Sequence, residues 1–87
     1  MATYRQLMDA ELRLADVRRR RGVSQDAMAE ALAVSQPNVS RIEREDDVYL
    51  STVARYVAAL GGRLEVRAVF GEESITLLSE TGAAAEP

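Results

Sequence analysis

The stretch SQDAMAEALAVSQPNVSRIER, residues 24–44, predicts two short helices joined by a tight turn. Ser24 and Ser35 each precede a helical pattern, and a serine hydroxyl at that position accepts a hydrogen bond from a free amide of the first turn. Pro37 falls in the first turn of the second helix, where its missing N–H costs nothing. The expected helices therefore span residues 25–33 and 36–43.

A further helix is expected on each side of this pair. Apolar residues recur at spacings of three and four within residues 3–21, and Gly22 can adopt the left-handed conformation that ends a helix. After the pair, a helix opened by Ser51 or Thr52 is stopped at Gly61. Two capped helices enclosed in this way form a helix-turn-helix unit.

Beyond residue 62 the period of the apolar residues changes to two, which predicts β-strands. Residues 63–70 alternate, residues 71–73 can turn the chain, and residues 74–78 return. We therefore expect a mainly α fold that ends in a β-hairpin. The expected parts are a helix-turn-helix domain over 1–62, a hairpin over 63–79 and a flexible tail over 80–87.

The apolar residues of the hairpin suggest an interface. A lone two-stranded ribbon is marginally stable, and its edges carry unpaired backbone groups that invite another strand. We expect a homodimer formed through Leu64, Val66, Ala68, Phe70, Ile75 and Leu77. Two alternatives remain: a partner protein could add a strand to the same edge, or the hairpin could merely cover the end of the helical core.

Composition excludes several classes of function. The 87 residues contain no cysteine and no histidine, so the usual zinc ligands and the usual general base are missing. An enzyme is therefore disfavoured, and no cofactor or metal is expected. No apolar run approaches the roughly 20 residues that span a bilayer, and the N-terminus lacks the apolar block of a signal peptide. We expect a cytoplasmic protein without membrane contact.

The charge is divided unevenly along the chain. The net charge is -3, yet residues 1–44 hold eight arginines against six acidic residues, and residues 45–87 hold three against eight. The positive half contains the second helix of the pair, whose glutamine, asparagine and arginine side chains can hydrogen-bond to bases in the major groove. This cluster predicts DNA reading; the alternative is that its members are ordinary solvated residues.

Residues 24–44 resemble the Cro/cI-type (XRE) helix-turn-helix family. The matching features are Gln25, Ala29, Leu32, and the segments VSQ (34–36) and VSRIE (39–43). Ala33 departs from the family, which usually has glycine in this turn. The stretch YVAALGGRLEVRAVFGEESITLL, residues 56–78, is similar to the segment that follows the helix-turn-helix in HigA-like antitoxins of bacterial type II toxin–antitoxin modules. The resemblance implies a four-to-five-helix, lambda-repressor-like domain.

The resemblance also implies a function and site residues. It implies a repressor that binds a double-stranded DNA operator, often its own, and neutralises a HigB/RelE-like ribonuclease toxin. With the homodimer expected from the hairpin, the operator consists of palindromic half-sites. Gln25 is implied to touch the DNA backbone and brace the recognition helix, and Gln36 is implied to be the best base reader. For Arg18 a phosphate contact and an internal ion pair both remain open. The other implied DNA contacts are Ser35, Asn38, Ser40, Arg41 and Arg44.

One alternative of a different class remains open. The chain could have kept the helix-turn-helix fold as a protein-interaction module without sequence-specific DNA binding, with its acidic surface bound to a basic partner. A steep loss of DNA affinity with salt would favour the repressor, because neutralised phosphates release counterions.

Overall fold

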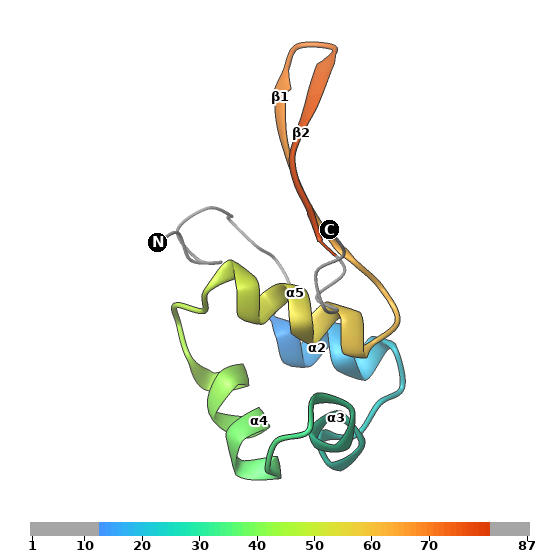
Figure 1. The fold of residues 1–87 in the computed structure, drawn as a ribbon, viewed down its shortest axis with the longest axis vertical. Coiled ribbons are helices and arrows are strands. Elements are labelled where there is room, and N and C mark those ends of the chain that lie inside the picture. The colour runs from blue at the N-terminus through green and yellow to red at the C-terminus, as the bar shows by residue number, and fades with distance from the viewer. Residues whose placement is uncertain (1–12, 81–87) are drawn as a thin grey trace.

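The computed structural model describes residues 13–80, which form four helices and one β-hairpin (Figure 1). The predicted mainly helical fold with a C-terminal hairpin is confirmed. The first part of the helix predicted over residues 3–21, and most of the predicted tail, lie outside the described residues. The elements are α2 (Leu14–Arg20), α3 (Gln25–Leu32), α4 (Gln36–Arg44), α5 (Leu50–Ala59), β1 (Leu64–Phe70) and β2 (Glu73–Glu80).

Both serine caps are present. The Ser24 hydroxyl accepts a hydrogen bond from the Ala27 N–H at 3.0 Å, and the Ser35 hydroxyl accepts one from the Asn38 N–H at 3.2 Å. These bonds satisfy amides that a helix start leaves free, and thereby set where α3 and α4 begin.

The start of α5 differs from the prediction. This helix begins at Leu50, and not at Ser51 or Thr52. The carbonyl of Tyr49 already accepts a hydrogen bond from the Val53 N–H at 3.0 Å, so the first helical bond forms without a side-chain cap. The helix therefore begins where the backbone geometry permits, ahead of the first hydroxyl in the sequence.

The turn between α3 and α4 keeps its shape despite the alanine. Ala33 has φ 59° and ψ 42°, which is the left-handed conformation that glycine adopts most easily. The Ala33 N–H donates to the Glu30 carbonyl at 3.1 Å, and the Val34 N–H donates to the Ala29 carbonyl at 3.0 Å. These bonds close the C-terminal end of α3 and fix the direction in which the chain leaves it, while the alanine Cβ adds about 1–2 kcal/mol of strain.

Each of the four helices contributes to one small core, and α4 contributes Val39 and Ile42. Because these two residues lie three apart on one side of α4, the opposite side of that helix is left in solvent. Figure 1 shows α3 and α4 next to each other on the side of α5 away from the hairpin. The buried apolar side chains are Leu14, Met28, Ala29, Val39, Ile42, Val48, Val53, Ala54 and Tyr56.

The hairpin extends away from the helices (Figure 1). Its antiparallel register pairs Val66 with Leu78 and Ala68 with Ile75. A register shift between Val66 and Arg67 leaves Leu77 as an extra residue on β2, so the simple alternation on which the sequence pattern relied is broken there. Leu78, instead of Leu77, therefore lies opposite Val66.

Candidate nucleic-acid interface

The outward side of α4 gathers most of the predicted DNA-contacting residues. Val39, Ile42 and Glu43 are buried, so the remaining positions of this helix face outward or flank the buried side. Ser35 caps the helix and is exposed, while Arg41 and Arg44 are exposed further along. The structure thus brings together Ser35, Gln36, Asn38, Ser40, Arg41 and Arg44 on one helix.

The arginines of this surface are paired within α4 and its cap. The Arg41 guanidinium donates to the Asn38 Oδ1 at 3.1 Å and to the Glu45 Oε2 at 2.7 Å. Arg44 donates to the Ser40 hydroxyl. Exposed pairs of this kind contribute only about 0–1 kcal/mol, so a phosphate can replace these partners at small cost.

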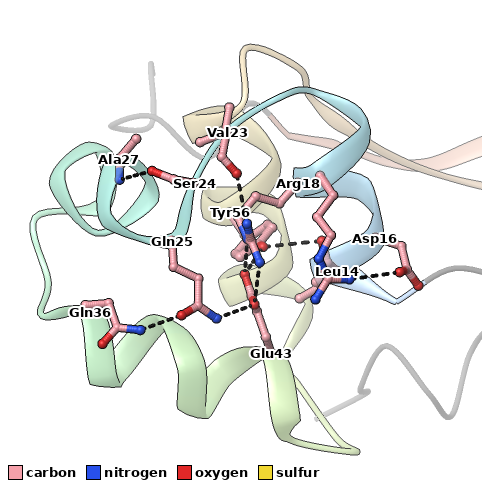
Figure 2. Close-up of polar contacts among 11 residues, drawn as sticks. Leu14, Asp16, Arg18, Val23, Ser24, Gln25, Ala27, Gln36, Glu43 and Tyr56 are labelled. Atoms are coloured by element: carbon pink, nitrogen blue, oxygen red, sulfur yellow. Dashed lines mark hydrogen bonds and ion pairs between the residues drawn. The ribbon is translucent and has the colours of Figure 1, made fainter.

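A buried ion pair lies directly behind this surface (Figure 2). The Arg18 Nε of α2 donates to the Glu43 Oε2 of α4 at 2.7 Å, and Arg18 Nη2 donates to Glu43 Oε1 at 3.2 Å. Arg18 is 6% exposed and Glu43 is 8% exposed. Arg18 also donates to the Val23 carbonyl at 2.8 Å. Of the two roles left open for Arg18, the structure has the internal ion pair, and Arg18 leaves the DNA-contacting set.

Two further donors complete the shell around Glu43. The Tyr56 hydroxyl of α5 hydrogen-bonds Glu43 Oε2, and Gln25 Nε2 of α3 donates to Glu43 Oε1 at 2.9 Å. No buried side-chain polar atom within residues 13–80 lacks a partner. The Glu43 carboxylate of α4 therefore links all four helices, because its hydrogen-bond partners lie on α2, α3 and α5.

The electrostatics of this cluster follow from its contacts. Burial by itself opposes the charged carboxylate, but hydrogen bonds from the guanidinium, the phenol and the amide outweigh it, so the pKa of Glu43 is lowered. The hydrogen bond to Glu43 raises the pKa of Arg18 against the opposing effect of burial. Burial, followed by the hydrogen bond to the carboxylate, raises the pKa of Tyr56.

Gln25 connects the buried pair to the predicted base reader. Its amide donates to Glu43 on one side, and its Oε1 accepts a hydrogen bond from Gln36 Nε2 on the other (Figure 2). The bracing of the recognition helix that the family resemblance implies is thus a direct contact between the first residues of α3 and α4.

The sequence interpretation did not identify the roles of Glu43 and Tyr56. A signal was present, because Glu43 lies four residues after Val39 and Arg18 lies four residues after Leu14, which puts both charges on buried helix faces. Charged residues on an apolar stripe indicate a buried pair. Their separation of 25 residues gives no local cue that they are partners.

The residues predicted for dimerisation differ in exposure. Leu64, Val66 and Ala68 are half-buried, and Leu64 packs against the helical core. Phe70 is 65% exposed and Leu77 is 67% exposed, and Ile75 is also exposed. Large apolar side chains in this state are typical of a surface that another chain covers.

No helix within residues 13–80 is long and apolar enough to cross a bilayer.

Comparison with known proteins identifies the family. Residues 4–69 match the family model of a helix-turn-helix domain. The chain is 42% identical over 77 residues to "Putative antitoxin HigA3" of Mycobacterium tuberculosis (strain ATCC 25618 / H37Rv), covering 83% of this chain and 71% of that protein. It is 34% identical over 67 residues to "Putative antitoxin HigA2" of the same organism, covering 75% and 66%.

Two solved structures are similar to most of this chain. One, described as "Induced DNA bending by unique dimerization of HigA antitoxin", has a TM-score of 0.70 and 43% identity, covering 79% of this chain and 97% of that chain. The other, "DNA bound antitoxin HigA3", has a TM-score of 0.70 and 38% identity, covering 90% and 97%. The chain therefore belongs to the helix-turn-helix family and, within it, to the HigA-like antitoxins.

Proposed function

We propose that this protein is a sequence-specific DNA-binding repressor that acts as the antitoxin and autorepressor of a type II toxin–antitoxin operon. The observation that carries the proposal is the outward side of α4, where amide, hydroxyl and guanidinium groups lie on a helix held from behind by Gln25. A similar protein of known structure is described as DNA-bound. The alternative, a protein-interaction module, is not favoured, because it does not explain why these polar groups lie together on the outward side of α4.

The N-terminal half of α4 is the part that enters the major groove. We assign base edges, which alone carry sequence information there, to Gln36 and Asn38 in this half and to Arg41 just beyond it. We assign phosphate contacts to Ser35, Ser40, Arg44 and the side-chain amide of Gln25. The weak internal pairing of Arg41 and Arg44 leaves both guanidinium groups free to exchange partners on binding.

A second copy of the chain is the partner we propose for the hairpin. A dimer places two recognition helices on palindromic half-sites about one DNA turn apart, roughly 34 Å. Because both helices then bind at once, the affinity of this small protein for its operator rises. A similar antitoxin is described as dimerizing and bending DNA. The exposed Phe70, Ile75 and Leu77 supply apolar area for this contact, together with the half-buried Leu64, Val66 and Ala68.

A HigB/RelE-like toxin is the further partner proposed, in the cytoplasm. An edge of the hairpin can accept a strand from such a partner, because its outer backbone groups are not paired within the hairpin. We expect no enzymatic activity from the antitoxin itself.

The test is a titration against the DNA upstream of the protein's own gene and against scrambled DNA, at two salt concentrations. We expect selective binding that weakens steeply with salt. Arg41→Ala should weaken binding to the upstream DNA, whereas Arg67→Ala, an exposed arginine on the hairpin, should not. Equal binding to both DNAs, with no effect of Arg41→Ala, would refute the repressor.

A further inference from the structure

We infer that Glu43 is a positioning residue which, through Gln25, fixes the atom that Gln36 turns toward DNA. The inference rests on the proposed function, because it concerns how the recognition helix reads bases. It goes beyond the bracing contact, since it assigns a hydrogen-bond polarity to the reader and traces that polarity to a buried carboxylate that does not reach the surface.

The first step is that Glu43 can only accept hydrogen bonds. It is buried, and Arg18 contacts both of its oxygens at 2.7 and 3.2 Å. Arginine stays protonated in proteins, and an ionised carboxylate has no hydrogen to donate. Whatever faces Glu43 must therefore be a donor.

The second step is that Gln25, which faces Glu43, must donate a hydrogen bond to it. The two ends of a glutamine amide have nearly the same shape, so packing alone does not distinguish its oxygen from its nitrogen. The carboxylate does distinguish them, and Gln25 presents Nε2 to Glu43 at 2.9 Å. Its Oε1 is consequently directed toward Gln36.

The third step fixes Gln36 in the same way. Opposite an oxygen of Gln25, it must turn its own Nε2 inward, as it does. The Gln36 oxygen then points away from Gln25 (Figure 2). No residue within 13–80 donates a hydrogen bond to that oxygen. Gln36 thus presents its side-chain oxygen, a hydrogen-bond acceptor, to DNA, and one hydrogen of its Nε2 stays available as a donor.

An outward acceptor selects bases that offer a donor in the major groove. Adenine N6 and cytosine N4 are the two such donors, whereas guanine O6 and thymine O4 would face oxygen against oxygen. The leftover Nε2 hydrogen can add a contact to adenine N7. The position read by Gln36 should therefore prefer adenine or cytosine over guanine or thymine by roughly tenfold.

The variant Glu43→Gln should reverse this preference. The new amide places its oxygen against Arg18 Nε and the Tyr56 hydroxyl, so its NH₂ stands in place of Oε1, where it faces Gln25 and ends the contact with Arg18 Nη2. Gln25 and Gln36 must each turn over to match, so Gln36 presents NH₂ outward and favours guanine or thymine. A merely structural role for Glu43 would instead lower affinity for every base at that position.

The double variant Gln25→Glu, Glu43→Gln should restore the original preference. A carboxylate at position 25 accepts from the amide at position 43 on one side and from Gln36 Nε2 on the other. The oxygen of Gln36 then faces outward again. Tyr56→Phe serves as the control, because it removes one hydrogen bond from Glu43 and leaves the contact of Glu43 with Gln25 in place.

The experiment measures binding of the full chain to duplexes of its upstream DNA with each position changed to every other base. Gln36→Ala locates the position that Gln36 reads, since only there does the preference vanish. Reversal in Glu43→Gln and recovery in the double variant are expected. An unchanged base preference in a folded Glu43→Gln protein overturns the inference that Glu43, through Gln25, fixes the orientation of the Gln36 amide. A wild-type chain without any base preference overturns the repressor itself.

A measurement on the wild-type protein covers the case in which Glu43→Gln does not fold, as judged by circular dichroism. The preferred adenine is replaced by purine, which lacks the N6 amino group, or by 7-deazaadenine, which lacks the N7 acceptor; a preferred cytosine is replaced by 2-pyrimidinone, which lacks N4. Removal of the amino group should weaken binding about tenfold. Loss on removal of N7, with none on removal of the amino group, overturns the assigned polarity.

Discussion

Replacement of Arg18 by methionine should strongly destabilise the fold, although Arg18 is buried and makes none of the proposed contacts with DNA. Methionine fills a similar volume but leaves Glu43 as a buried charge, 8% exposed and without its ionic partner. Removing one member of a buried pair costs about 3–5 kcal/mol. A domain of this size has a total stability of about 4–13 kcal/mol, so Arg18→Met loses a large share of it.

Urea unfolding followed by circular dichroism measures the loss. With an m-value near 1–1.5 kcal/mol per molar, as expected for a small domain, the midpoint should fall by about 2–5 M. Protein concentration must be held constant between variants, because dimer formation makes the apparent stability depend on it.

The double variant Arg18→Met, Glu43→Leu separates charge burial from lost packing. It should recover stability to within about 2 kcal/mol of the wild type, because no unpaired charge remains. The Tyr56 hydroxyl lies 3.3 Å from the Leu14 carbonyl and keeps that acceptor. If Arg18→Met costs under about 1 kcal/mol, or if the double variant is no more stable than the single one, the reasoning about the buried pair fails.

Two further predictions concern the turn and the pH dependence. Ala33→Gly should raise the stability by about 0.5–1 kcal/mol, because relief of left-handed strain exceeds the added flexibility of the unfolded chain. Thermal melting measures the change. The control variant Ala31→Gly, at an exposed helical position, should instead destabilise the protein. The lowered pKa of Glu43 contributes stability that is present above pH 4.5 and is lost as the pH falls through its folded pKa. The raised pKa of Tyr56 contributes stability that is present below pH 10 and is lost at higher pH. Unfolding free energies measured against pH should show both losses of stability. Tyr56→Phe should abolish the loss at alkaline pH. An alkaline loss of the same size in Tyr56→Phe would contradict its assignment to Tyr56.

The helices, the caps of α3 and α4 and the hairpin could be predicted because each depends on residues close together in the sequence. Ser24 and Ser35 cap amides three residues away. The apolar period of α4 and the change of period at the hairpin are equally local, so they survive in any tertiary context that buries one face. The same locality explains why the polar side of α4 could be named in advance.

Only the tertiary structure decided which charges are buried and which residues are partners. Arg18 stands within a run of four arginines that reads as a solvated helix end, yet the packing of α2 against α4 brings it to Glu43. The β2 bulge likewise exchanges Leu78 for Leu77 opposite Val66. Local patterns show which face of an element is apolar, whereas ion pairs and strand register depend on segments distant in the chain, whose meeting is set by the packing of the whole domain.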